Sequence, residues 1–282
     1  MCSSLITLSA VWQLCCADLS IVLEPAKVQT VESDIVFLRV RFENLSAEPI
    51  FARHTPTPAS GVLKLESRKR GEETYRHVPT LGENQGWGIG DEGQQQFAPR
   101  QVRTTAVVMA STERVQAFDG SGDYEVRVFL RDSERFHGMS EPILIKVEKV
   151  DEAVRSASVN AMRLITRSLS GRSTRYKEQD FLDAAKALPD SEMKRTLEWL
   201  AAVAHVRDAE TPADLIDAGK ELELLRKNAT GPARDWIAIT MARTYIKMGK
   251  LELAGREARL LADGSFDREE IEKSILAKLS GR

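Results

Sequence analysis

The spacing of hydrophobic residues changes once along this chain, near residues 147–152, and the change limits the folds open to it. Before it, apolar and polar residues alternate, as in Ile35 to Phe42, where Leu38, Val40 and Phe42 share one face. After it, apolar residues recur every three or four positions. Alternation is typical of a strand with one buried face, and the longer period of an amphipathic helix. We therefore expect a β-rich N-terminal half and an α-helical C-terminal half.

Seven or eight short strands are predicted before this change. They cover residues 19–23, 35–42, 49–52, 62–66, 74–78, 101–109, 124–130 and 142–147. Turn-forming sequences lie between them, and one of these, Lys69-Arg70-Gly71-Glu72, is a hairpin signal. Many short strands separated by turns favour two antiparallel sheets packed face to face.

The segment from Asp119 to Val126 (DGSGDYEV) resembles the tyrosine corner of immunoglobulin-like domains, with Tyr124 two positions before a core residue. The resemblance implies an immunoglobulin-like β-sandwich over residues 18–149, in which the Tyr124 hydroxyl bonds to nearby backbone. A calcium loop is the alternative, because Asp119, Ser121 and Asp123 alternate. An EF-hand loop needs Gly at its sixth position and Glu at its twelfth, whereas this chain has Tyr and Leu there.

Seven helices are predicted after the change in spacing. They cover residues 154–169, 176–188, 191–206, 212–227, 233–248, 251–261 and 267–279. Asp190 is placed to cap the third helix, and Pro212 stands in the first turn of the fourth. Asp267 begins a segment of capping-box form with Glu270, and we expect it to start the seventh helix.

The helices at 233–248 and 251–261 form the most regular pair. Ala242 and Tyr245 lie on one face of the first helix, Gly249 is suited to the turn, and Ala254 lies in the second helix. This arrangement resembles a tetratricopeptide-type repeat. The resemblance implies a stack of helical hairpins over residues 150–282. A generic antiparallel helix pair is the alternative, because other positions of the repeat pattern are replaced.

Two places could contact a partner. Arg243 and Lys247 are four residues apart on the other face of the first helix, with Thr240 nearby, and could form a basic stripe for an acidic segment. The alternative is a solvated charged face. Trp87 stands between glycines in the long segment 79–96, so it is either a contact residue or a plug over the end of the sandwich.

The first 17 residues (MCSSLITLSAVWQLCCA) form an uncharged apolar run that is too short for a stable membrane span. The run resembles a secretory signal peptide, with Ala17 before the expected cleavage, although it has no basic residue near Met1. A mis-assigned start or a short buried strand is the alternative. The chain's three cysteines all lie in this run (Cys2, Cys15 and Cys16). A mature chain from residue 18 would therefore have neither a disulfide nor a thiol nucleophile.

The sequence favours binding over catalysis. The net charge of -2 does not favour nucleic acid as a partner. The four histidines have no metal-ligand spacing and no nucleophile elbow is present, so we expect no catalytic residue, metal or cofactor. We expect an exported protein, periplasmic or extracellular, that binds a protein partner or acts as a scaffold. A proteinase inhibitor or a carbohydrate- or cell-wall-binding protein using the sandwich loops is the alternative, and an unrecognised enzyme is another.

Overall fold

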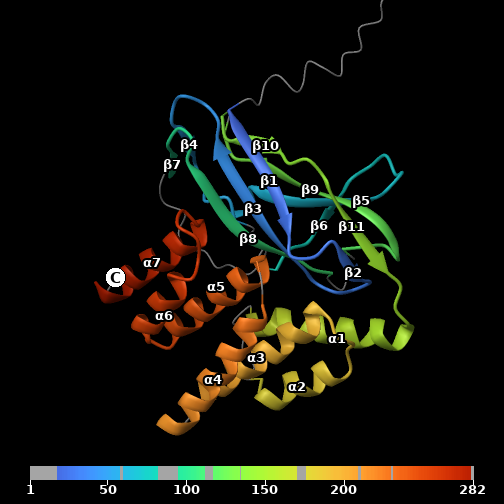
Figure 1. The fold of residues 1–282 in the computed structure, drawn as a ribbon, viewed down its shortest axis with the longest axis vertical. Coiled ribbons are helices and arrows are strands. Elements are labelled where there is room, and N and C mark those ends of the chain that lie inside the picture. Colours follow the sequence, from blue (N-terminus) through green and yellow to red (C-terminus); the bar gives the residue numbers. More distant parts are fainter. Residues whose placement is uncertain are drawn as a thin grey trace, which may run out of the picture.

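The computed structural model describes residues 18–57, 60–81, 95–111, 117–133, 135–169, 176–208, 211–229 and 231–280, without the side chains of 212–218. These residues form a mixed α and β structure, in which strands come first along the chain and helices follow (Figure 1). The expected leader, residues 1–17, and Trp87 lie outside the described residues.

The strands form two larger sheets and one small pair. Their bounds are β1 (Leu19–Pro25), β2 (Gln29–Val31), β3 (Val36–Asn44), β4 (Ile50–Ala52), β5 (Leu63–Lys69), β6 (Arg76–Val78), β7 (Gln95–Phe97), β8 (Val102–Met109), β9 (Gly122–Arg131), β10 (His137–Met139) and β11 (Ile143–Glu148). One sheet has the order β1-β3-β8 and the other β2-β11-β9-β5-β6, with β10 beside β9, while β4 pairs with β7. β2 runs parallel to β11, and the other pairs named here are antiparallel.

The eight expected strands are all present, with ends shifted by a few residues. β2, β7 and β10 were not expected, because three residues are too few to establish an alternation. The hydroxyl of Tyr124 donates to the carbonyl of Gly120 at 2.9 Å, and the side chain is buried against Phe118. The predicted structural role of Tyr124 is confirmed.

The seven expected helices are also present. They are α1 (Glu152–Leu169), α2 (Glu178–Lys186), α3 (Glu192–Asp208), α4 (Pro212–Asn228), α5 (Gly231–Lys247), α6 (Leu251–Ala258) and α7 (Phe266–Leu279). Gly249 has a φ of 74°, which is the left-handed conformation expected between α5 and α6. Ala242 and Ala254 are fully buried, as the predicted hairpin requires. Among the described residues, no helix combines the length and the apolar character needed to cross a membrane.

Two predicted helix caps are wrong. Asp190 does not cap α3; its carboxylate pairs with Arg195, and the Ser191 hydroxyl accepts the Lys194 amide instead. Asp267 does not begin α7, because the helix starts at Phe266 with Ser265 in the cap position. The Asp267 carboxylate instead accepts hydrogen bonds from strand β8. Asp190 is thus taken by an arginine five positions along the chain, whereas the partners of Asp267 are more than 150 positions away.

Helices α5 and α7 pack against strands β3 and β8 of the β1-β3-β8 sheet (Figure 1). Phe37 of β3 contacts Trp236 of α5 at 5.4 Å between ring centroids, and Trp236 contacts Trp199 of α3 at 5.3 Å. One buried cluster therefore joins sheet and helices. The last strand ends at Glu148 and the first helix begins at Glu152, but whether the two parts fold separately stays a prediction.

Candidate functional site

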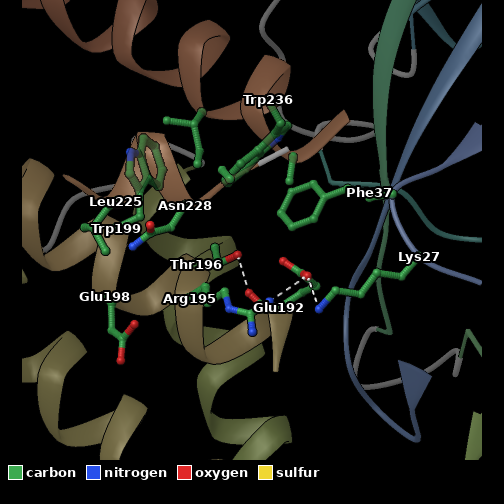
Figure 2. A pocket seen from close by; sticks show the side chains of 14 residues that line it. Lys27, Phe37, Glu192, Arg195, Thr196, Glu198, Trp199, Leu225, Asn228 and Trp236 are labelled. Carbon is green, nitrogen blue, oxygen red and sulfur yellow. Dashed lines mark hydrogen bonds and ion pairs between the residues drawn. The ribbon is translucent and has the colours of Figure 1, made fainter. Parts of the chain in front are cut away.

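A cavity of about 250 Å³ lies where α3, the start of α5 and the outer face of β3 meet (Figure 2). Phe37, Trp199 and Trp236 form its aromatic walls. Ala229 and Ala233 also line it, and their small side chains leave room that larger residues would fill. The cavity is therefore a consequence of rigid aromatic groups facing short side chains across the junction of sheet and helices.

Each aromatic wall is held by its own element. Trp199 is only 1% exposed and meets the edge of Trp236 at an interplanar angle of 62°. Trp236 is buried between that ring and Phe37. Offset and edge-to-face contacts of this kind resist rotation of the rings, so the walls are set before anything enters.

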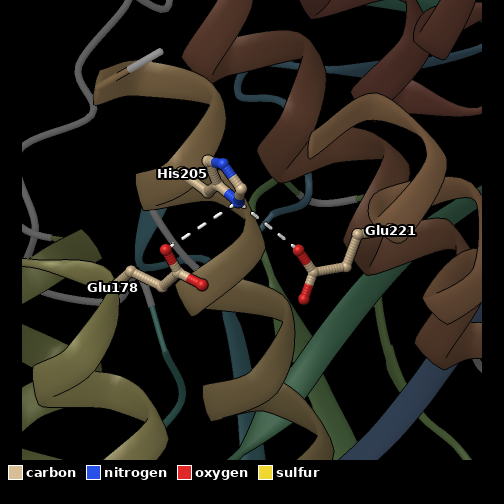
Figure 3. A group of neighbouring side chains, drawn as sticks. All are labelled: Glu178, His205 and Glu221. Atoms are coloured by element: carbon tan, nitrogen blue, oxygen red, sulfur yellow. Dashed lines mark ion pairs between the residues drawn. The ribbon is translucent and has the colours of Figure 1, made fainter. Parts of the chain in front are cut away.

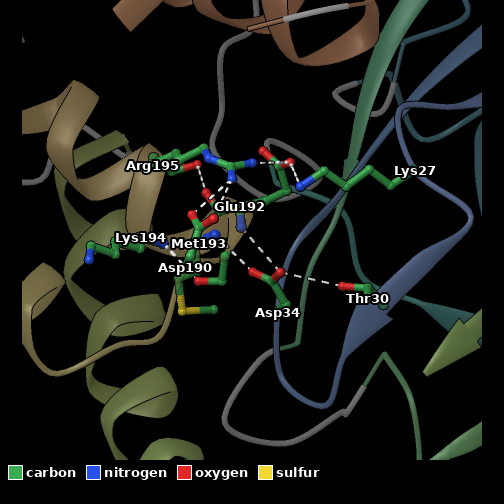
Figure 4. Close-up of polar contacts among 10 residues, drawn as sticks. Lys27, Thr30, Asp34, Asp190, Glu192, Met193, Lys194 and Arg195 are labelled. Carbon is green, nitrogen blue, oxygen red and sulfur yellow. Dashed lines mark hydrogen bonds and ion pairs between the residues drawn. The ribbon is translucent and has the colours of Figure 1, made fainter. Parts of the chain in front are cut away.

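Charged groups line the cavity next to the aromatic walls. Oε1 of Glu192 forms ion pairs with Nζ of Lys27 at 2.5 Å and with a guanidinium nitrogen of Arg195 at 3.0 Å (Figure 4). Glu192 therefore links α3 to the connection between β1 and β2, where Lys27 lies. Glu198 also lines the cavity, so its two cationic side chains stand beside two carboxylates. The aromatic surface is the part of the cavity best suited to an apolar group.

Asp34 positions the helix that carries Trp199. Its carboxylate accepts the amide of Met193 at 2.8 Å and that of Glu192 at 3.2 Å, in the first turn of α3 (Figure 4). Such bonds satisfy amides that have no partner inside the helix. The side chain is only 5% exposed, and its burial raises the pKa of Asp34 to about 6.

A second buried carboxylate, that of Asp267, joins α7 to strand β8 of the β1-β3-β8 sheet. Asp267 accepts the Thr105 hydroxyl at 3.0 Å and the Ala106 amide at 3.1 Å. Burial raises the pKa of Asp267 to about 6, because its effect is larger than the opposing effect of the positively charged Arg243. Next to it, the buried guanidinium of Arg103 pairs with Glu269 and lies 4.2 Å from the centre of the Phe266 ring.

Arg243 and Lys247, proposed from the sequence as a basic stripe, are not among the residues that line the cavity. The Arg243 guanidinium donates to Glu270 of α7 at 3.1 Å, so it turns toward a neighbouring helix. Desolvation, and then the nearby Arg243, lower the pKa of Lys247. Thr240 is only 8% exposed, which corrects its placement on an open face, because α5 packs against β3 and β8. Binding of a partner by Arg243 and Lys247 stays a prediction, and Trp87 lies outside the described residues.

The aromatic residues of the cavity were not singled out from the sequence, although one signal was present. Phe37 occupies the same face of β3 as Arg39 and Arg41, in a strand whose opposite face is apolar. A large apolar residue among charged ones on that face indicates that something covers part of it. Nothing local points to Trp199 and Trp236 as partners, since they are 37 positions apart in different helices.

The structure also brings Glu178 of α2, His205 of α3 and Glu221 of α4 together, far apart as they are in sequence. The sequence led us to expect no metal site, because the histidines show no ligand spacing. Here the ligand-type atoms converge from three helices, an arrangement that spacing along the chain does not reveal.

Comparison with known proteins leaves the family open. No protein-family model and no curated protein matches the chain. Solved structures similar to part of it include a sporulation control protein from Bacillus subtilis, at 11% identity and a TM-score of 0.30, covering 52% of this chain and 56% of that one. They also include a CARDB domain in complex with di-metal ions from Pyrococcus furiosus, at 10% identity and a TM-score of 0.25, covering 46% and 88%.

A β-glucosidase from Erythrobacter marinus is similar at 10% identity and a TM-score of 0.27. The match covers 46% of this chain but only 15% of the β-glucosidase. All three TM-scores lie below 0.5, so these likenesses assign neither an activity nor a ligand to this chain.

Proposed function

We propose that this chain is a non-catalytic protein-binding or scaffold protein whose cavity receives one large apolar side chain of a partner polypeptide. The observation that carries the proposal is the cavity between Phe37, Trp199 and Trp236. Its volume of about 250 Å³ is below the roughly 300–1,000 Å³ usual for small-molecule sites. Protein interfaces, in contrast, concentrate their affinity in a few anchor side chains that enter well-packed pockets.

The charged groups beside the aromatic walls are consistent with this occupant. Lys27 and Arg195 both pair with Glu192, so these charges already have partners without a ligand. An apolar anchor would contact the aromatic walls and leave those pairs in place. We further propose that the strands form an immunoglobulin-like sandwich and that α5 and α6 form a tetratricopeptide-like hairpin, which would provide a rigid frame for the cavity.

Export is part of the same proposal. The apolar run at residues 1–17 holds every cysteine of the chain, and its removal would leave a thiol-free protein. N-terminal sequencing of protein purified from its native source should begin at Asp18. An intact Met1 on protein isolated from the cytosol would contradict export, without bearing on the cavity.

The cavity is tested by filling it. Ala229→Phe should place a ring in the space that the anchor needs, whereas Ala277→Phe makes the same change on the exposed surface of α7. The immobilised chain is used to select from a displayed library of random peptides. We expect enriched peptides to share one aromatic or leucine anchor, to bind the Ala277→Phe variant normally, and to lose at least about tenfold in affinity for Ala229→Phe.

Two results would contradict the proposed anchor site. One is a selection that enriches no shared anchor. The other is an enriched peptide that binds both phenylalanine variants equally well, because its site would then lie away from the cavity. Thermal melting of both variants serves as the control, since a folded Ala229→Phe protein is needed to attribute lost binding to the filled space.

A further inference from the structure

Three side chains from three helices converge at the end of α3 that is remote from the Asp34 cap (Figure 3). Glu178 lies in the first turn of α2, His205 in the last turn of α3 and Glu221 in α4. One ligand-type atom from each lies within 4.8 Å of the other two. The convergence is produced by helix packing alone.

The distances in this group do not fit direct hydrogen bonds. Nδ1 of His205 lies 3.8 Å from Oε2 of Glu178 and 3.6 Å from Oε2 of Glu221. Hydrogen bonds between nitrogen and oxygen usually span about 2.7–3.2 Å. Nδ1 is itself buried and has no hydrogen-bond partner among the described residues, which is uncommon for a polar atom in a folded protein.

The same distances fit atoms that share a cation. Zn²⁺ binds imidazole nitrogen and carboxylate oxygen at about 2.0–2.2 Å, and tetrahedral geometry then holds neighbouring ligand atoms roughly 3.3–3.6 Å apart. The observed 3.6 and 3.8 Å are close to that range. Rotation of the two partly exposed glutamates would bring their carboxylate oxygens, which lie within 4.8 Å of each other, into it as well.

Charge supports the same conclusion. Two carboxylates and a neutral imidazole carry two negative charges, which a divalent cation would balance. Imidazole is a good ligand for zinc and its neighbours in the transition series, whereas calcium and magnesium prefer oxygen ligands alone. Nδ1 of His205 is buried, but the two glutamate side chains are 40% and 42% exposed, so an ion could reach the site along them and keep water as its fourth ligand.

We propose that Glu178, His205 and Glu221 form a binding site for a divalent transition metal ion of the Zn²⁺ type. The ion ties α2 and α4 to α3, so its binding stabilises the helical part of the protein. Because metal binding free energy adds to the stability of the folded state, the melting temperature rises with metal concentration. The site is separate from the aromatic cavity, and the proposal does not depend on the proposed function.

The experiment uses the full chain, purified without a histidine tag, with serine replacing Cys2, Cys15 and Cys16 so that thiolates do not bind the ion. Calorimetric titration with Zn²⁺ should show one saturable site per chain, and Co²⁺ in its place should give the visible absorption of a four-coordinate ion. Ca²⁺ should neither bind with comparable affinity nor raise the melting temperature.

Three variants remove one ligand each: Glu178→Gln, His205→Gln and Glu221→Gln. Each should weaken Zn²⁺ binding by about tenfold or more, since loss of groups that only support a ligand already has effects of that size. The control carries His77→Gln with Glu252→Gln, which changes the same residue types at exposed positions of β6 and α6. It should bind Zn²⁺ like the parent protein.

The proposal is overturned if the parent protein binds no Zn²⁺ at one ion per chain. It is also overturned if His205→Gln and Glu221→Gln bind the ion as tightly as the control does, because the metal would then lie elsewhere. Melting without added metal reports on folding of each variant, so a loss of binding in a well-folded variant is attributable to the missing ligand.

Discussion

At the scale of single residues, buried carboxylates form hydrogen bonds between the helices and the strand region. Asp34, in the connection between β2 and β3, bonds to a helix, and Asp267 of α7 bonds to strand β8. Both are held by backbone amides, and burial raises the pKa of each to about 6. Neither role can be predicted from neighbouring residues, because the hydrogen-bond partners are more than 150 positions away in the sequence.

Asp267→Asn should change how stability depends on pH. The folded state raises the pKa of Asp267 from 3.8 to about 6, so it binds the proton more tightly than the unfolded chain does. The contribution of this carboxyl to stability is therefore fully present below about pH 4 and is lost as pH rises through 6. The melting temperature of Asp267→Asn relative to wild type should rise between about pH 4 and pH 7. A constant difference would show that Asp267 does not titrate in this range.

Tyr124→Phe should cost about 1 kcal/mol of unfolding free energy, because the Gly120 carbonyl loses its hydroxyl partner while the ring contacts remain. Chemical denaturation measures the change. Tyr75→Phe is a comparison at a less buried tyrosine, whose hydroxyl donates to Glu125, and should cost less. Equal costs at the two positions would contradict the structural role assigned to Tyr124.

At the scale of elements, α3 and α5 are the helices that tertiary contacts define. Helical spacing predicts where both lie, but the first-turn amides of α3 bond to Asp34, in the connection between β2 and β3, and α5 is enclosed between α6 and strands β3 and β8. This explains why Thr240, expected on an open face of α5, is buried. A helix with several neighbours has no simple polar side to read from the sequence.

Asp34→Ala should destabilise the protein by about 1–2 kcal/mol, because two amides in the first turn of α3 lose their acceptor. Asp190→Ala is the matched control, since Asp190 is the nearby acid that the sequence favours as a cap. It should change stability by less than about 1 kcal/mol, the usual value of an exposed ion pair. A larger effect at Asp190 than at Asp34 would reverse this assignment.

At the scale of the whole molecule, the two halves share a hydrophobic surface. Ile35, Phe37, Val108 and Ala110 of the strand region belong to one buried cluster with the helices. Phe37 and Trp236 link the sheet to the wall of the proposed anchor cavity. Docking of the halves and formation of the cavity are therefore expected to occur together.

Separate expression of residues 18–149 and 150–282 tests how far each half folds alone. We expect β-type and α-type circular dichroism spectra, respectively, with each fragment melting below the intact chain because the shared cluster becomes exposed. Fragments that melt at the temperature of the intact protein would show that the shared surface adds no stability. Phe37→Ala in the intact chain should shift melting in the same direction as separation, since it removes the contact with Trp236.

The sequence by itself determined the local structure of this protein: eight strands, seven helices, the structural role of Tyr124 and the turn at Gly249 all follow from periodicity and local turn chemistry. Tertiary structure alone decided the rest. It placed Trp236 against Phe37 on the outer face of β3, brought Asp34 to two first-turn amides of α3, enclosed a cavity with Trp199 and Trp236, and brought Glu178, His205 and Glu221 together. Local signals act over a few residues, whereas these features depend on which surfaces meet after the chain has folded.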